Sequence, residues 1–245
     1  MSTVQLLVGP LGPFAPDEDT HVVARNDGRW LVSERTTRAV LRLSDANPCG
    51  AVGVWAPPDG AFASALGVET GRAELFSDGL LIAGLAAGEW LALTPGTGAA
   101  LVPVLAAIAG GEDTVLIDRS AGLATFRLTG VGAGDLLAEL CEDVRAGHAP
   151  ADGGVVTSAV AGLRCTIVRD DLLPEELLAG FDSDEVVAGT AVVDLDEHAP
   201  LVASYLLVCD RSIARQLHAR ILAAGAADGI EPEGYGRYRS YHQDV

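Results

Sequence analysis

Two segments of this chain, roughly 115 residues apart, repeat the same order of predicted elements. Residues 89–111 read EWLALTPGTGAALVPVLAAIAGG, and residues 204–226 read SYLLVCDRSIARQLHARILAAGA. Each segment predicts a buried strand, a short turn and a helix that ends in small residues. Extended segments precede both pairs, so we predict an α+β fold of two related β-rich halves, in which helices pack on antiparallel or mixed sheets.

Glycine-containing dipeptides between apolar runs place three hairpins in the sequence. The turns are Asp27-Gly28 within residues 21–34, Gly88-Glu89 within 80–95, and Ala161-Gly162 within 155–171. The remaining patterns predict single strands at 39–45, 114–120 (buried), 123–130 (alternating) and 204–210, and helices at 57–69, 98–111, 132–144 and 211–225, the last capped by Asp210.

These elements divide the chain into four expected regions. Residues 1–19 form an extended, proline-rich N-terminal arm, and residues 20–112 form the N-terminal α+β half. Residues 113–229 form the C-terminal α+β half, which carries an acidic insertion at 171–200. Residues 230–245 form a tail rich in tyrosine and arginine.

The charge of the chain excludes several classes of partner and of chemistry. There are 34 acidic against 16 basic residues, for a formal net charge of -18, so binding to nucleic acid or to an anionic membrane is not expected. All the basic residues are arginine. The absence of lysine excludes a Walker-A phosphate loop, Schiff-base chemistry and pyridoxal-phosphate anchoring.

The cysteines and the apolar segments predict a cytoplasmic location. The cysteines at 49, 141, 165 and 209 form no C-x-x-C pair, which argues against a zinc knuckle or a redox pair and favours four free thiols in a reducing compartment. The N-terminus lacks the features of a signal peptide, and Gly98–Gly111 is too short to span a bilayer.

A glycine-rich turn offers one candidate ligand site. Gly96-Thr97-Gly98 lies between a predicted strand and a helix, and Asp118 follows about 20 residues later, as in a dinucleotide-binding fingerprint. Leu101 stands where the third glycine belongs, and the later segments read as hairpins. A tight turn and a nucleotide or small-molecule binding module both remain as interpretations.

Two arginine-containing surfaces are candidates for binding a partner. Arg211 and Arg215 share one stripe of the last helix with His218, opposite an apolar stripe of Ile213, Leu217 and Ile221. The tail combines the two residue types enriched at interface hot spots, in Tyr235, Arg237, Tyr238, Arg239 and Tyr241. The alternatives are a solvated helix face and a frayed terminus.

The segment TVLIDRSAGLATFRLTGVGAGDLLAELCEDV resembles the aminomethyltransferase-like, folate-binding fold. That family carries an Asp-x-Ser at a strand end, an alternating strand, a glycine and a helix ending near an aspartate. Here these are Asp118-Arg119-Ser120, Phe126–Leu128, Gly130 and Leu136–Asp143. GLAAGEWLALTP, which contains Trp90, and SYLLVCDRSIARQLHARIL resemble segments of the sarcosine oxidase gamma-subunit branch.

The resemblance implies an accessory role in a larger complex. Gamma-like chains are small subunits of a heterotetrameric, flavin-containing oxidase that demethylates sarcosine and can pass the one-carbon unit to tetrahydrofolate. The flavins and NAD belong to the large subunits, so no cofactor is expected to bind tightly to this chain, and the expected partners are larger flavoprotein-type subunits or further copies of itself. Tetrahydrofolate is the ligand implied for the resembling residues Asp118, Arg119, Ser120, Trp90 and Arg164.

One departure from the family pattern argues against independent catalysis. The family's transferases place a catalytic aspartate after Gly-Gly in the hairpin that follows the leucine-rich helix. Here that hairpin reads Ala161-Gly162-Leu163-Arg164-Cys165, and arginine cannot act as a base. We therefore expect no catalytic residue. The alternative is a stand-alone tetrahydrofolate-dependent transferase or demethylase that uses Asp118, with Arg119 or Arg164 on the folate glutamate tail.

Overall fold

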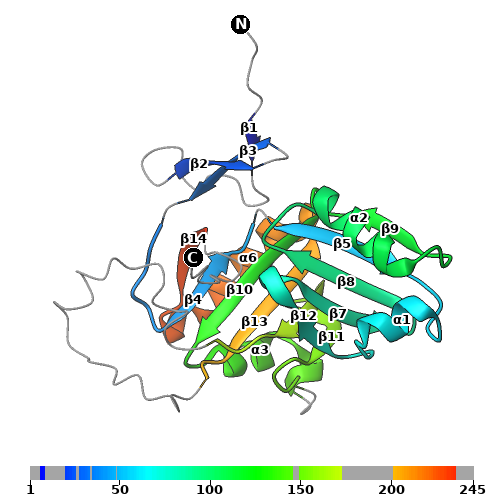
Figure 1. Ribbon diagram of the computed structural model, residues 1–245. Coiled ribbons are helices and arrows are strands. Elements are labelled where there is room, and N and C mark those ends of the chain that lie inside the picture. Colours follow the sequence, from blue (N-terminus) through cyan, green and yellow to red (C-terminus); the bar gives the residue numbers. More distant parts are fainter. Residues whose placement is uncertain are drawn as a thin grey trace, which may run out of the picture.

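A computed structural model of the chain describes residues 6–8, 20–25, 28–33, 35–47, 49–145, 149–172 and 201–235. The described strands form three sheets (Figure 1). The five-stranded sheet has the order β6-β7-β8-β5-β9, the six-stranded sheet the order β11-β12-β13-β10-β4-β14, and the three-stranded sheet the order β1-β3-β2.

The strands of the five-stranded sheet are β5 (Gly50–Trp55), β6 (Ala73–Leu75), β7 (Leu81–Ala86), β8 (Glu89–Thr94) and β9 (Val115–Asp118). Those of the six-stranded sheet are β4 (Leu41–Asp45), β10 (Leu123–Gly130), β11 (Val155–Val160), β12 (Leu163–Arg169), β13 (Ser204–Asp210) and β14 (Glu231–Tyr235). The small sheet consists of β1 (Leu6–Val8), β2 (Thr20–Arg25) and β3 (Gly28–Ser33).

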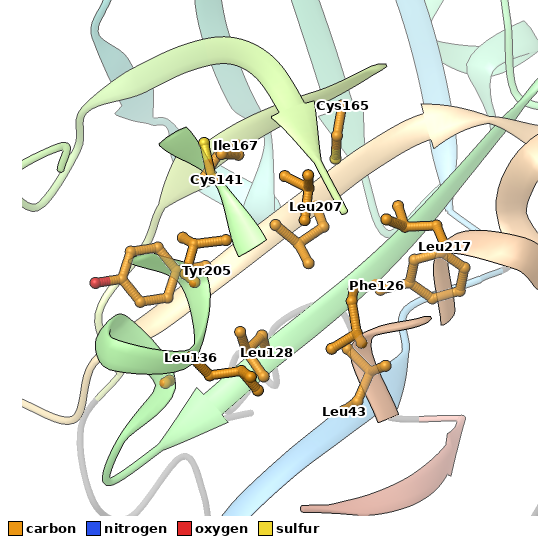
Figure 2. Packing of buried hydrophobic residues seen from close by; sticks show 14 of the residues in the cluster. Leu43, Phe126, Leu128, Leu136, Cys141, Cys165, Ile167, Tyr205, Leu207 and Leu217 are labelled. Atoms are coloured by element: carbon orange, nitrogen blue, oxygen red, sulfur yellow. The ribbon is translucent and has the colours of Figure 1, made fainter. Parts of the chain in front are cut away.

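The two large sheets pack face to face, and helices cover their outer faces. Leu91 and Leu93 of one sheet meet Val168, Leu206 and Val208 of the other in a shared apolar cluster. Helices α1 (Ala61–Leu66) and α2 (Gly98–Ala109) pack on the five-stranded sheet, and α3 (Ala133–Leu140) and α6 (Ala214–Ala224) pack on the six-stranded one. Figure 2 shows the second of these helix–sheet clusters, around Phe126 and Leu207. The result is a four-layered α/β/β/α arrangement.

Topology confirms the two related halves. The first runs β5-α1-β6-β7-β8-α2-β9, and the second runs β10-α3-β11-β12-β13-α6-β14. Both arrange their equivalent strands in the same order, except that β4 is inserted between β10 and β14. Strand β4 is antiparallel to β10 and parallel to β14, so β14 runs opposite to β10 just as β9 runs opposite to β5. Strand β4 thus comes from before the first half and completes the sheet of the second.

The three predicted hairpins are confirmed, but two of the predicted turns are misplaced, because Gly28 is the first residue of β3 and Glu89 is the first residue of β8. Strands β2 and β3 pair from Arg25 and Gly28 outward, β7 pairs with β8, and β11 pairs with β12. In the last hairpin Ala161 and Gly162 have φ values of 50° and 77°, the left-handed pair that a two-residue type I′ turn requires.

The predicted helix boundaries follow from their caps. Helix α2 begins after Thr97, whose side chain accepts a hydrogen bond from the N–H of Ala100 at 3.1 Å, and it ends at Gly110 in the left-handed conformation. Pro103 lies inside this helix. Before α6, Asp210 accepts a hydrogen bond from the N–H of Ser212 at 2.8 Å and caps the short 3₁₀ turn η3 (Arg211–Ile213) that leads into the helix.

Three expectations about burial and strand number are wrong. Strand β9 was expected to be buried, yet it is an edge strand on which Val115 and Ile117 are 51% and 48% exposed. Strand β10 alternates in sequence, yet all its residues are buried because the other sheet or the helices cover both of its faces. The sequence patterns also missed β5, β6 and β14.

Several expected features lie outside the described residues. These are the N-terminal arm apart from Leu6–Val8, the insertion from residue 173 to 200, and the tail from residue 236 onward with Arg237, Tyr238, Arg239 and Tyr241. Tyr235 is described as the last residue of β14, opposite Asp45.

Candidate functional site

The Asp-x-Ser motif forms a hydrogen-bonded turn where β9 ends and the chain enters β10. One carboxylate oxygen of Asp118, Oδ1, accepts hydrogen bonds from the N–H and the hydroxyl of Ser120, at 2.9 and 2.6 Å. The carbonyl of Arg119 accepts hydrogen bonds from the N–H groups of Gly122 and Leu123 at 2.8 and 3.0 Å. Asp118 therefore fixes the turn that carries Arg119.

Two sequence motifs meet at this turn. The N–H of Ala51 in β5 donates to Ser120 Oγ at 3.0 Å, and the N–H of Arg119 donates to the Ala51 carbonyl at 2.8 Å. Gly98, the first residue of α2, approaches so closely that a Cβ atom there would collide with the Asp118 carboxylate and Ser120 Oγ. The glycine at 98 is thus explained by packing. An acid beside the first turn of α2 complements the helix dipole but would repel a phosphate.

Arginines gather at the same end of the two sheets, around Asp210. Leu123 pairs with Asp210, and the Arg211 N–H donates to the Gly122 carbonyl at 2.9 Å. Hydrogen bonding from Ser212 lowers the pKa of Asp210, and the charge of Arg119 adds a smaller lowering. Because Cys165 and Cys209 are cross-strand partners that face the helices, their neighbours Arg164 and Asp210 face the opposite side of the sheet.

We call this group, Asp118, Arg119, Ser120, Arg164, Asp210 and Arg211, the strand-end cluster. The resemblance implies a folate contact for five residues, and all of them except Trp90 belong to this cluster. Of the two helix arginines expected to bind a partner, Arg211 belongs to it and Arg215 does not. Arg164 is exposed, and Arg119 and Arg211 are partly exposed. Arg215 lies farther along α6 and is also exposed. The cluster can therefore present guanidinium groups to a carboxylate.

Asp45 lies beside this cluster and was missed from the sequence. Asn47 donates to Asp45 Oδ1 through its N–H and its side-chain Nδ2, at 2.9 and 2.7 Å. Burial raises the pKa of Asp45 to about 6, against the lowering effects of the Asn47 hydrogen bonds and of the Arg211 charge. A carboxyl that titrates near neutrality can exchange a proton, and no local motif marks it because its burial depends on β10 and the loop at Asn47.

Trp90 does not join the strand-end cluster. Its side chain is 5% exposed and packs on the helix-covered face of the five-stranded sheet, edge-on to Phe62 with ring centres 6.0 Å apart. Its indole N–H donates to the Val68 carbonyl at 2.9 Å. The indole therefore helps to build the apolar cluster under α1 and α2.

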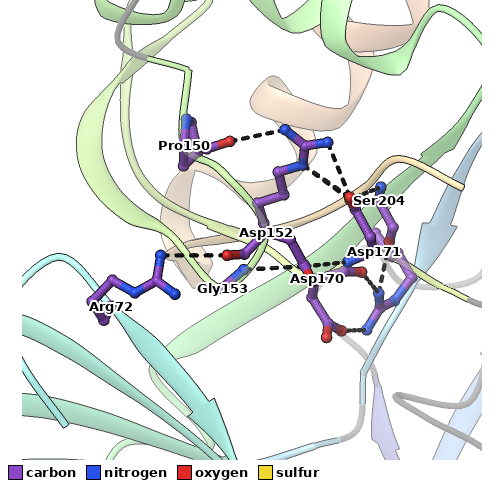
Figure 3. A network of polar contacts seen from close by, with 9 residues as sticks. Arg72, Pro150, Asp152, Gly153, Asp170, Asp171 and Ser204 are labelled. Atoms are coloured by element: carbon purple, nitrogen blue, oxygen red, sulfur yellow. Dashed lines mark hydrogen bonds and ion pairs between the residues drawn. The ribbon is translucent and has the colours of Figure 1, made fainter. Parts of the chain in front are cut away.

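A second polar group lies at the opposite end of the sheets (Figure 3). Arg127 of β10 forms an ion pair with Asp170 at 2.7 Å and donates to Ser204 Oγ at 2.7 Å and to the Asp170 carbonyl at 3.2 Å. The side chains of Arg127 and Asp170 are each 7% exposed. Burial of this charge is tolerated because the guanidinium has a carboxylate and further acceptors.

Neighbouring polar contacts extend this network across the two halves. Arg169 pairs with Asp171 at 3.0 Å and donates to the Pro150 carbonyl at 3.1 Å, and hydrogen bonding to Asp171 raises the pKa of Arg169. Asp152 Oδ1 accepts from the N–H of Asp171 at 3.0 Å, while the Asp152 carbonyl accepts from Arg72 at 3.4 Å. The network thus fixes the end of β12 and the start of β13.

His218 and the cysteines have packing roles. His218 was expected on the basic stripe of the last helix, but it is 2% exposed and its ring centre lies 5.6 Å from that of Phe126, so this expectation is wrong. Burial lowers its pKa to about 4. All four cysteines are free, as predicted, and the structure shows that all four are also buried. Burial raises the pKa of Cys209 to about 12 and that of Cys165 well above its usual value, which disfavours the reactive thiolate.

Two further findings concern the described residues as a whole. They contain no group of three or more His, Cys, Asp or Glu side chains arranged to hold a metal ion. None of their helices is long and apolar enough to cross a membrane.

Comparisons with known proteins define the class of fold. No family model and no curated protein matches the sequence. A chain of the heterotetrameric sarcosine oxidase from Corynebacterium sp. U-96, in complex with pyrrole 2-carboxylate, matches with a TM-score of 0.55 and 16% identity, over 79% of this chain and 88% of that chain. The glycine cleavage system aminomethyltransferase T from Bartonella henselae matches with a TM-score of 0.61 and 16% identity, over 95% of this chain and 60% of that chain. The chain therefore has the aminomethyltransferase-like α+β fold predicted from its sequence.

Proposed function

We propose that this chain is an accessory, gamma-like subunit of a heteromeric sarcosine oxidase-like or folate-linked amine-demethylating complex. In this role it binds and positions larger subunits, which carry the flavin and oxidise the amine. It contributes surfaces and no catalytic group of its own.

The extent of the structural similarity supports this proposal most directly. The match spans 88% of a chain from a heterotetrameric enzyme, so the two chains correspond over nearly the whole of that subunit. Only 60% of the aminomethyltransferase chain is matched, so that enzyme contains a further part without a counterpart in the match.

The hairpin between β11 and β12 supports the same proposal. The transferases that this chain resembles carry a catalytic carboxylate just after this turn, whereas this chain has Leu163 and an exposed Arg164 there. Asp118 is the remaining acid of the family pattern, and its Oδ1 is engaged by Ser120. No second acid or imidazole is hydrogen-bonded to Asp118 among the described residues, so a proton relay through it lacks a partner.

The strand-end cluster supplies the contacts of the proposed subunit. Arg119, Arg164 and Arg211 can each form paired hydrogen bonds with a carboxylate, supplied by an acidic segment of a partner or by the glutamate tail of a folate. Any flavin would be held by the partner subunits.

Co-purification tests this proposal. This chain, with an affinity tag, is co-expressed with the products of the genes beside its own, and the eluate is assayed by flavin absorbance and native mass spectrometry. We expect a flavin-containing complex of fixed stoichiometry. Arg119→Glu combined with Arg211→Glu should reduce recovery of the flavoprotein, whereas Arg145→Glu, at an exposed arginine paired with Glu142 outside the cluster, should not. A chain that purifies alone in all cases would contradict the proposal.

A stand-alone tetrahydrofolate-dependent transferase is the second candidate, favoured by the match of 95% of this chain to aminomethyltransferase T. In that case Asp118 would act through its other oxygen, and Arg119 or Arg164 would hold the glutamate tail. Tetrahydrofolate is titrated into the isolated chain while one-carbon transfer from sarcosine is measured. Turnover that is lost in Asp118→Asn would support this candidate over the accessory role.

A nucleotide-binding role for the Gly96–Gly98 turn is the third candidate. Thr97 already accepts from the N–H of Ala100 at the start of α2, and the Asp118 carboxylate lies against Gly98, where it would repel a phosphate. NAD is therefore expected to leave the melting temperature unchanged, and a saturable rise would favour the third candidate.

A further inference from the structure

Strand β9 is an edge strand, with outward backbone groups that no described strand pairs. The Arg119 N–H donates to the Ala51 carbonyl, so the backbone groups of residues 115, 117 and 119 point toward β5. Those of Thr114, Leu116 and Asp118 therefore point away from the sheet, where no described strand pairs with them. Such a row of donors and acceptors is a template for another strand.

The surface around this edge is apolar. Val115 and Ile117 on β9 are 51% and 48% exposed, and β9 contains neither proline nor lysine to discourage pairing. Helix α2, which packs on both β5 and β9, contains no polar side chain from Gly98 to Ala109, yet its Val104 and Ile108 are 52% and 40% exposed. A helix that is apolar on all sides is typical of a buried helix.

We infer that a second copy of this chain covers this surface, through antiparallel pairing of two β9 strands about a twofold axis at Leu116. The two five-stranded sheets then form one continuous sheet across the dimer. This interface goes beyond the proposed accessory role: it uses the edge of the sheet and α2, and it shares only Asp118 and Arg119 with the strand-end cluster.

The sequence of β9 and its flanks is complementary to itself in this register. Leu116 lies opposite Leu116 of the other copy, and Thr114 lies opposite Asp118, so the outward backbone groups meet as hydrogen-bonded pairs. Val115 then lies opposite Ile117 in the close, non-hydrogen-bonded positions, and their apolar side chains cover each other.

The charges flanking β9 select the same register. Asp113 is exposed and precedes the strand, and Arg119 follows it. With Leu116 on the axis, Asp113 of one copy faces Arg119 of the other, twice in the dimer. A shift of one residue in one direction would place Asp113 opposite Asp118, and a shift in the other direction would place Val115 opposite Asp118. Either shift would also misalign the backbone donors and acceptors. An acid before and a base after the strand suit a twofold antiparallel pair.

Helix α2 extends the contact beyond the strands. In the dimer the strand order is β5, β9, then β9 and β5 of the second copy, with neighbouring strands about 4.8 Å apart. A helix α2 centred between β5 and β9 would therefore lie about 10 Å from α2 of the second copy. Helices pack at about 8–10 Å. The two apolar α2 helices would then lie in contact on the same face of the continuous sheet and bury Val104 and Ile108.

Sedimentation equilibrium of the full chain tests this inference. The wild type is expected at twice the chain mass. Ile117→Glu should weaken the dimer at least about tenfold by placing two acids in the apolar centre, while Val131→Glu, at a residue 79% exposed near the start of α3, should leave it intact. Circular dichroism confirms that both variants are folded.

Charge reversal tests the register. Asp113→Arg alone or Arg119→Asp alone should each weaken the dimer roughly tenfold by setting like charges opposite each other, and the combined variant should restore it. Exchange of the amide hydrogens of residues 114, 116 and 118 should slow with increasing concentration. A monomeric wild type, a dimer unaffected by Ile117→Glu, or a combined variant that stays dissociated would each overturn the inference. Slower exchange of these amides only in the presence of a different protein would also overturn the inference.

Discussion

Arg127 and Asp170 form an ion pair at 2.7 Å between the two sheets, where both side chains are almost completely buried. The pair joins the middle of β10 to the residue that follows β12. Ser204, at the start of β13, accepts a further hydrogen bond from Arg127 at 2.7 Å. Three strands of the six-stranded sheet therefore depend on one guanidinium group.

Asp170→Ala is expected to lower the free energy of unfolding by about 3–5 kcal/mol, because it removes the carboxylate that pairs with the buried charge of Arg127. Urea denaturation followed by circular dichroism measures this loss. Arg145→Ala, which breaks an exposed pair with Glu142, should change the unfolding free energy by less than about 0.5 kcal/mol. A similar, small effect of both substitutions would mean that the buried pair is not needed.

His218 makes the protein less stable in acid. Its pKa is about 4 in the folded chain and 6.5 in the unfolded chain, so between these values only the unfolded chain binds the proton. The His218 contribution is therefore fully present above pH 6.5 and is lost as the pH falls to 4, by about 3 kcal/mol in total. Unfolding curves at several pH values should show this slope, and His218→Leu should flatten it. An unchanged slope in the variant would assign the effect to other groups.

Asp45 acts in the opposite direction. Its pKa is raised to about 6 in the folded chain, so folding binds a proton between pH 3.8 and 6 and becomes less favourable as the pH rises through that range. Asp45→Asn keeps an acceptor for Asn47 and removes the buried charge. We expect the variant to be more stable than the wild type by about 1–3 kcal/mol at pH 8 and to lose this advantage below pH 4. A destabilised variant at pH 8 would show that attraction to the charge of Arg211 outweighs the cost of burying the Asp45 carboxylate.

The turn between β11 and β12 contains a strained residue. Ala161 has a φ of 50°, a conformation that alanine adopts at a cost of about 1 kcal/mol. Ala161→Asn should raise the free energy of unfolding by about 0.5–1 kcal/mol, since Asn-Gly is favoured in this turn type. Ala87→Asn is the matched control in the hairpin of β7 and β8, because Ala87 lies outside the left-handed region. Equal effects of the two substitutions would contradict this explanation.

Local signals allowed prediction of the hairpins and most helices. Gly88 and Gly162 have positive φ values at their turns, and this preference of glycine itself marks a hairpin in any sequence. Caps such as Asp210 likewise act within a few residues. Such features depend on short-range chemistry and can be found in a single sequence.

Strand β5 was missed for a reason that lies elsewhere in the chain. Its sequence GAVGVW contains Gly50 and Gly53, which weaken a strand pattern. A Cβ at Gly50 would collide with Thr97 and Gly98 at the start of α2, and one at Gly53 would collide with the ring of Trp55. The Gly50 contact forms only when β5 and α2 have met, so the composition of β5 gives no local sign of it, whereas Trp55 lies two residues from Gly53 in the same strand.

The candidate site was predictable only in part. The motif at Asp118 marked the turn, but its contact with Gly98 and the arginines around Asp210 depend on the meeting of β5, β9, β10 and β13. Arg127 was hidden by the alternation of β10, which predicts a solvent-facing position, whereas the second sheet covers that face. Folate binding and partner binding by these residues stay predictions.

The role of this chain as a non-catalytic subunit is tested most directly by assaying one-carbon transfer from sarcosine to tetrahydrofolate, for the isolated chain and for its complex with co-expressed flavoprotein subunits. We predict no turnover by the isolated chain and demethylation only by the flavin-containing complex, with Asp118→Asn leaving the activity of the assembled complex within about twofold, since its carboxylate supports a turn. Turnover by the isolated chain that disappears in Asp118→Asn would contradict the account.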